Sequence, residues 1–174
     1  MTATQRVLLE NGRWRAYAGV GQLRYTNSPP HRHWHLMKFD VYQLRTPSGD
    51  ALVSDRKSGF CLADHWGTAP GGYPGRRAHY LGNCKQRQPG ATSVLQGTSV
   101  GFTDRYPAFF HGQNVELTNV PDGVYDLVHR ANPTMLLREL RYENGVASVR
   151  LRVTWREGVP EIRVLRRCYR SATC

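Results

Sequence analysis

The chain has 174 residues, a formal net charge of +11 and 40% apolar residues. This balance is typical of one globular domain and excludes disordered, collagen-like and coiled-coil chains; no apolar run approaches the roughly 20 residues of a transmembrane helix. We therefore expect residues 1–174 to form a single domain. All but three of the 24 basic residues are arginines scattered along the chain, which predicts attraction to polyanions such as a cell-wall surface rather than a dedicated nucleic-acid site.

Short runs rich in β-branched and aromatic residues follow one another along the chain. They cover residues 20–26, 33–44, 114–120, 124–130, 146–155 and 161–167. Turn sequences separate several of these runs, and Asn144-Gly145 is typical of a type I′ hairpin with positive φ at both residues. In the run 146–155, Val149, Leu151 and Val153 alternate with Arg150, Arg152 and Thr154, which indicates one buried face. These patterns predict an all-β fold, an antiparallel β-sandwich.

Two segments depart from the strand pattern. Residues 133–140 are the one candidate helix, and it is short. Between Asp64 and Val100 the chain is rich in glycine and proline, which predicts a long irregular loop. A loop of this length within a compact domain is usually functional or disordered.

The four cysteines are Cys61, Cys84, Cys168 and Cys174. Four cysteines allow three pairings, and the sequence does not choose among them, although local order favours Cys61–Cys84 and Cys168–Cys174. Disulfides would indicate an oxidising compartment, and four reduced thiols in a cytosolic protein are the alternative. The N-terminal residues lack the basic and apolar regions of a signal peptide.

Three histidines stand at alternate positions in His31-Arg32-His33-Trp34-His35. In a strand their side chains would share one face, with Cα atoms about 6.6 Å apart at each step. Three imidazoles at that spacing can converge on one ion. All-imidazole ligation suits copper, zinc, iron or nickel, and Cu(II) stands highest in the divalent affinity order. An exposed histidine-rich strand without a metal is the alternative.

Two further residues have side chains suited to chemistry. Lys57 carries an amine that can lose its proton and become a nucleophile, which arginine cannot. Tyr106, 49 residues later in the chain, carries a phenol that can be oxidised to a quinone. Taken singly, each is more often a surface charge or a core ring.

Three segments together resemble the lysyl oxidase family. HRHWHLMKFDVYQL, which begins at His31, is similar to the family's copper-binding strand. DRKSGFCLADH, which contains Lys57, is similar to its lysine segment, and DRYPAFFHGQNVELTNVPDGVY, which contains Tyr106, is similar to the segment around its modified tyrosine. The three occur in family order, and the short chain resembles the bacterial members.

The resemblance implies a secreted or extracellular copper amine oxidase. His31, His33 and His35 would hold copper, and Lys57 and Tyr106 would form a lysine tyrosylquinone. Asp104 would be the base or an orienting group. With dioxygen, such an enzyme oxidises primary amines, peptidyl lysine among them, to aldehydes and releases ammonia and hydrogen peroxide. The alternatives are a catalytically silent metal-binding β-sandwich and a basic polyanion-binding module.

Overall fold

A computed structural model describes residues 1–29, 31–55, 59–67, 77–107 and 114–174. The chain divides into two compact units, one made of Met1–Met37 with Gly59–Pro107 and the other of Lys38–Ser58 with Ala108–Cys174. Every regular element in the described ranges is a β-strand and all their pairings are antiparallel, which confirms the predicted all-β class. The two larger sheets, of four and five strands, are antiparallel throughout, as the sheets of a β-sandwich are. The described part of the chain contains no helix long and apolar enough to span a membrane.

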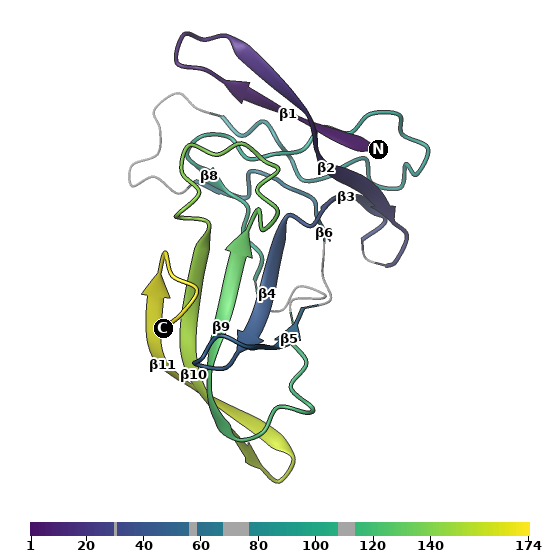
Figure 1. Ribbon diagram of the computed structural model, residues 1–174. Coiled ribbons are helices and arrows are strands. Elements are labelled where there is room, and N and C mark those ends of the chain that lie inside the picture. The colour runs from purple at the N-terminus through teal and green to yellow at the C-terminus, as the bar shows by residue number, and fades with distance from the viewer. Residues whose placement is uncertain (30, 56–58, 68–76, 108–113) are drawn as a thin grey trace. The chain divides into compact units, whose positions relative to one another are not determined.

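The first unit contains a four-stranded sheet in the order β1-β2-β3-β6 (Figure 1). Its strands are β1 (Thr2–Leu8), β2 (Trp14–Thr26), β3 (His33–Met37) and β6 (Gly59–Phe60). Of these strands, the sequence predicted the second half of β2 and, within the run 33–44, β3; β1 and β6 were not predicted. β1 has few apolar residues, and Ala3 is its one buried side chain, so the usual hydrophobic alternation is weak there.

The same unit holds a small second sheet and a long irregular segment. β7 (Trp66–Gly67) pairs with β8 (Phe102–Thr103), so two short strands close the base of this segment. Residues 77–100, where they are described, form no strand or helix, which confirms the predicted irregular loop. Most of its Gly/Pro-rich stretch, residues 68–76, lies outside the described residues.

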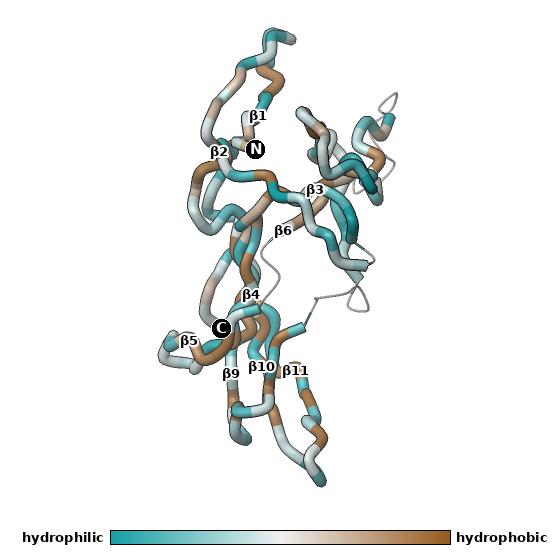
Figure 2. Tube along the Cα trace, turned by 90° about the vertical axis from the view of Figure 1, so that its right-hand side faces the viewer, coloured by the Kyte–Doolittle hydropathy of each residue, from teal (hydrophilic) through white to brown (hydrophobic). Residues whose placement is uncertain are grey.

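The second unit contains a five-stranded sheet in the order β11-β10-β9-β4-β5 (Figure 1). Its strands are β4 (Asp40–Arg45), β5 (Ala51–Ser54), β9 (Gly123–Ala131), β10 (Val146–Arg156) and β11 (Val159–Tyr169). Leu151 and Val153 of β10 are buried with Leu44, Val120 and Tyr125 in one apolar cluster. The predicted buried face of β10 is thus confirmed for these two residues but not for Val149, which is half-buried, because the register shifts between Arg150 and Leu151. Hydrophobic and hydrophilic positions are interleaved along the edge strand β11 (Figure 2).

The tight hairpin of this sheet lies at a different place from the one predicted. Glu157 and Gly158 form the two-residue connection between β10 and β11, with φ values of 50° and 80°. Positive φ at both positions is the mark of a type I′ turn. Asn144 and Gly145 precede β10 without positive φ, and residues 132–145 before it are irregular. An Asn-Gly pair needs a strand on each side to form a hairpin, and here one is missing.

The predicted strand over residues 33–44 is two strands in two different sheets. The break falls at Lys38, whose φ of 57° is incompatible with a continuous strand. The predicted strand at 114–120 is absent, because Val120 closes a turn by donating its N–H to the Leu117 carbonyl at 2.8 Å. Val115, Leu117 and Val120 nevertheless pack in the core cluster. Apolar alternation in this segment therefore reflects burial without sheet pairing.

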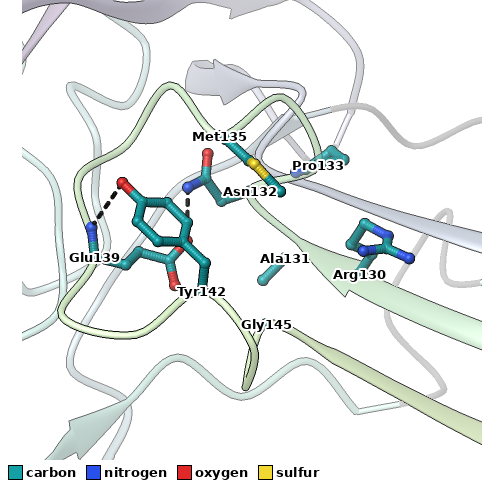
Figure 3. A pocket seen from close by; sticks show the side chains of 8 residues that line it. All are labelled: Arg130, Ala131, Asn132, Pro133, Met135, Glu139, Tyr142 and Gly145. Carbon is teal, nitrogen blue, oxygen red and sulfur yellow. Dashed lines mark hydrogen bonds between the residues drawn. The ribbon is translucent and has the colours of Figure 1, made fainter. Parts of the chain in front are cut away.

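The candidate helix at 133–140 is also absent. Asn132 organises this segment: its side-chain amide donates to the Leu137 carbonyl at 2.9 Å and to Glu139 Oε1 at 2.6 Å, and its Oδ1 accepts from the Leu137 N–H at 3.1 Å. The hydroxyl of Tyr142 also donates to the Leu137 carbonyl, at 3.2 Å. These groups surround a small pocket (Figure 3). Side-chain hydrogen bonds of this kind compete with helical ones.

Candidate metal and tyrosine site

The three histidines lie at and just before the start of β3. His33 and His35 alternate with buried Trp34 on β3, as strand geometry requires. His31 precedes the strand in a turn, where its N–H donates to the Ser28 carbonyl at 2.6 Å. The expectation that all three histidines belong to one strand is therefore wrong for His31.

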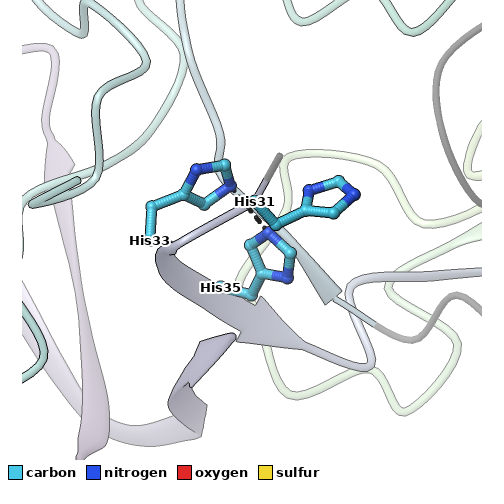
Figure 4. Close-up of side chains that lie close together, drawn as sticks. All are labelled: His31, His33 and His35. Carbon is cyan, nitrogen blue, oxygen red and sulfur yellow. Dashed lines mark hydrogen bonds between the residues drawn. The ribbon is translucent and has the colours of Figure 1, made fainter. Parts of the chain in front are cut away.

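The three imidazoles nonetheless converge (Figure 4). One ring nitrogen from each of His31, His33 and His35 lies within 4.8 Å of the others. The Nε2 atoms of His33 and His35 are 2.8 Å apart. The ring centroids are 4.7 to 5.7 Å apart. The turn before β3 thus places His31 beside the two strand histidines.

This donor set fits a transition-metal ion. Two nitrogens that share an ion at about 2.0 Å each lie at most about 4 Å apart. The pair formed by His33 and His35 already meets that limit, and the third ring needs a movement below about 1 Å. Three neutral imidazoles are ligands for copper, zinc, nickel or iron.

A hydroxyl from the neighbouring strand orients one of these rings. Thr26, the last residue of β2, lies beside β3 because Thr26 pairs with His33 in the sheet. Its Oγ1 is 3.1 Å from His35 Nδ1. When Nδ1 donates to this hydroxyl, Nε2 keeps a free lone pair for a metal. Thr26 carries no recognisable signal in the sequence, because its role depends on strand pairing.

Strand β6 brings the tyrosine segment to the histidine strand. Leu36 and Met37 of β3 pair with Phe60 and Gly59. The ring of Phe60 packs edge-on against Tyr106, with centroids 4.9 Å apart. The Tyr106 hydroxyl donates to the next carbonyl along, that of Cys61, at 3.1 Å. The histidine strand and Tyr106 are therefore neighbours of the same two-residue strand.

A disulfide makes a second connection between these segments. Cys61 is bonded to Cys84, and Cys168 is bonded to Cys174, which are the two pairs that local order favours. The Cys84 carbonyl accepts from the N–H of Trp34, between the two strand histidines, at 3.0 Å. The disulfide thus joins Cys61, whose carbonyl is hydrogen-bonded to Tyr106, with Cys84, whose carbonyl is hydrogen-bonded to β3.

Asp104 and Lys57 are the remaining residues singled out by the sequence. The Asp104 side chain is 9% exposed, and its Oδ1 lies 2.7 Å from Nδ1 of His65. Its other oxygen accepts from the N–H of Ala63 at 3.3 Å. Lys57 lies outside the described residues, two positions before β6 in the sequence. His65 was not identified from the sequence, because a single histidine in a loop carries no pattern.

Asp64 fixes the irregular segment next to this site. Its carboxylate accepts hydrogen bonds from the N–H groups of His79, Tyr80 and Ser99 and from the Ser99 hydroxyl, at 2.6 to 3.2 Å. Burial raises the pKa of Asp64, but these hydrogen bonds, first those from Ser99, outweigh burial and lower the pKa overall. The aspartate therefore holds the loop together in its ionised form.

The second unit has its own cluster of ionisable groups. Tyr42 of β4 stacks on His129 of β9, with ring centroids 4.2 Å apart, and His129 Nε2 lies 3.1 Å from Asp40. The Tyr42 N–H donates to Asp55 at 3.2 Å. Burial, with Asp40 and Asp55 nearby, raises the pKa of Tyr42 to about 12. Burial is also the main cause that raises the pKa of Asp55.

Comparison with known proteins identifies the family. The lysyl oxidase family model matches residues 9–161. Protein-lysine 6-oxidase of Rattus norvegicus is 32% identical over 126 residues, which are 71% of this chain and 27% of that protein; for the Sus scrofa enzyme the identity is the same and the share of that protein is 45%. Lysyl oxidase homolog 1 of Homo sapiens is 30% identical over 128 residues, 72% of this chain and 20% of that protein. The match thus spans less than half the length of each of these relatives. Because the family model covers most of its length, this chain belongs to the lysyl oxidase family.

Proposed function

We propose that this chain is a secreted copper-dependent amine oxidase whose organic cofactor is a quinone made from Tyr106 and Lys57. It would oxidise primary amines, including peptidyl lysine, to aldehydes with release of ammonia and hydrogen peroxide. The observation that carries the proposal is the meeting of three family segments around β6. This strand pairs with the histidine strand, packs Phe60 on Tyr106 and follows Lys57 by two residues.

The histidines would hold the metal. His33 and His35 have Nε2 atoms 2.8 Å apart, and the third ring lies within reach of the same ion. Copper with dioxygen would supply the oxidation of the phenol, and the quinone would take up the two electrons of the amine. The protein's part is positional: Phe60 packs on the Tyr106 ring and the Cys61 carbonyl holds its hydroxyl. Lys57 would supply the nucleophilic amine for the cross-link.

A matched pair of lysine variants tests the cross-link. Lys57→Arg keeps the positive charge but cannot supply a nucleophilic amine, whereas Lys85→Arg makes the same change at a lysine outside the proposed cross-link. After copper loading under air, we expect a quinone redox stain and amine-dependent peroxide release in the wild type and in K85R, and neither in K57R. Equal staining of both variants would refute the proposal. Tight copper binding without stain in the wild type would favour the silent metal-binding alternative.

The charge of the chain bears on its partners. A surface with net charge +11 repels cationic amines in bulk. Strand β11 also exposes three arginines, Arg163, Arg166 and Arg167. The enzyme would therefore be anchored on a polyanionic surface such as a cell wall. Turnover of a diamine by the free enzyme should fall as salt is reduced; a rise at low salt would contradict this expectation.

A further inference from the structure

An imidazole–carboxylate pair lies beside Tyr106, and the fold builds it from two distant segments. β7 pairs with β8 through Trp66 and Thr103. Continuing this antiparallel register by one residue brings His65 opposite Asp104. Their side chains meet there, with His65 Nδ1 2.7 Å from Asp104 Oδ1. The pair is therefore a product of sheet pairing between residues 39 positions apart.

The carboxylate is anchored, and the imidazole is accessible. Asp104 is 9% exposed and also accepts from the Ala63 N–H, whereas the His65 side chain is 40% exposed. An ionised carboxylate at Nδ1 selects the tautomer that carries its proton on Nδ1 and leaves Nε2 as an acceptor. Gly82 keeps the space beside this nitrogen open, because a Cβ at that position would lie 3.2 Å from Nε2.

The spacing between His65 and Tyr106 suits proton transfer from a bound substrate. Their ring centroids are 6.5 Å apart, with the planes inclined at 71°. Phe60 already packs on the Tyr106 ring. A substrate held against the Tyr106 ring would therefore be a neighbour of the His65 imidazole, and proton transfer to that imidazole requires an approach of about 3 Å.

We propose that His65 is the proton acceptor of the amine oxidation and that Asp104 is its positioning residue. The inference rests on the proposed function. The C–H bond of the carbon that bears the amine breaks, and an N–H bond forms at His65 Nε2. The quinone of the proposed function would take up the electron pair, and dioxygen would be the final oxidant. Asp104 is the less accessible of the two, because it is 9% exposed and hydrogen-bonded to His65 and to the Ala63 N–H, and it therefore orients the imidazole.

The test compares His65→Gln and Asp104→Asn with the control His79→Gln, another exposed histidine of the same loop. Phenylhydrazine titration measures quinone content, and anaerobic mixing with benzylamine or its α-deuterated form measures the rate of quinone reduction. We expect full quinone in H65Q, with reduction slowed about 10²- to 10⁴-fold and a deuterium effect retained. The rate of H79Q should match that of the wild type. Asp104→Asn should slow the step less than H65Q.

A second readout needs neither metal nor quinone. Nitrogen NMR of the metal-free protein should show His65 with its proton on Nδ1 in the wild type, and a mixture of tautomers in D104N. A merely structural role for Asp104 would leave the tautomer unchanged. Full quinone with an unimpaired rate in H65Q, or a proton on Nε2 of His65 in the wild type, would overturn the inference alone. Copper-loaded wild type without titratable quinone would overturn the proposed function and the inference with it.

Discussion

Replacing Cys61 and Cys84 together by alanine should both destabilise the protein and loosen the metal site. The bond closes a loop with a sequence separation of 23. The chain-entropy relation then gives a stabilisation of about 3.4 kcal/mol at 25 °C. Cys168–Cys174, with a separation of 6, gives about 2.2 kcal/mol by the same relation. Removing the second disulfide, which lies in the other unit, is thus a control with a smaller expected loss of stability.

The two disulfides differ in what they hold. The carbonyl of Cys84 accepts a hydrogen bond from the N–H of Trp34, which lies between two histidines. The carbonyl of Cys61 accepts one from the Tyr106 hydroxyl. Urea unfolding should therefore show the larger loss for the C61A/C84A variant. Copper titration should show weakened affinity in that variant and wild-type affinity in C168A/C174A. If C61A/C84A lost less free energy of unfolding than the control and kept its copper affinity, the account of this disulfide would be refuted.

Three further outcomes follow from single contacts. Thr26→Val should weaken copper affinity about 10- to 100-fold in a competition titration, because it removes the hydroxyl that contacts Nδ1 of His35. Unchanged affinity would contradict the proposed orientation of His35 by Thr26. Hydrogen bonds from Arg150 lower the pKa of buried Asp126. Its ionised carboxylate therefore stabilises the folded protein above the unfolded-state pKa of about 3.9, and this stabilisation is lost as pH falls through the folded-state pKa. Asp126→Asn should therefore lower the free energy of unfolding in urea at pH 7, and this free energy should vary less with pH in the acid range. The raised pKa of Tyr42, about 12, means that stability present below about pH 10 is lost as pH rises toward 12; Tyr42→Phe should reduce this loss, whereas Tyr169→Phe, at an exposed site, should not.

The sequence predicted the parts of the fold that depend on local pattern. Leu151 and Val153 of β10 alternate with arginine and are buried as expected. The pattern was misleading where a turn or side-chain hydrogen bonds interrupt it. The run 33–44 reads as one strand, yet the positive φ of Lys38 divides it between two sheets. Residues 133–140 read as a helix, yet hydrogen bonds from Asn132 fold them irregularly.

The candidate site shows the same division between local and distant information. The spacing of His31, His33 and His35 was sufficient to predict convergence, although a turn rather than a strand provides the first ligand. Thr26 and His65 could not be predicted, since each acquires its partner through the pairing of two strands. The residue pattern within one segment does not predict which other segment it pairs with.

Peptide mapping after trypsin digestion tests the central claim, a covalent bond between Lys57 and Tyr106, most directly. Trypsin cuts after arginine and unmodified lysine, so a cross-linked and reduced protein should give one species that joins residues 57–76 to residues 106–130. We predict this species from copper-loaded wild type and its absence from K57R and from protein prepared without copper. Complete recovery of the separate peptides 58–76 and 106–130 from copper-loaded, aerated wild type would contradict the account.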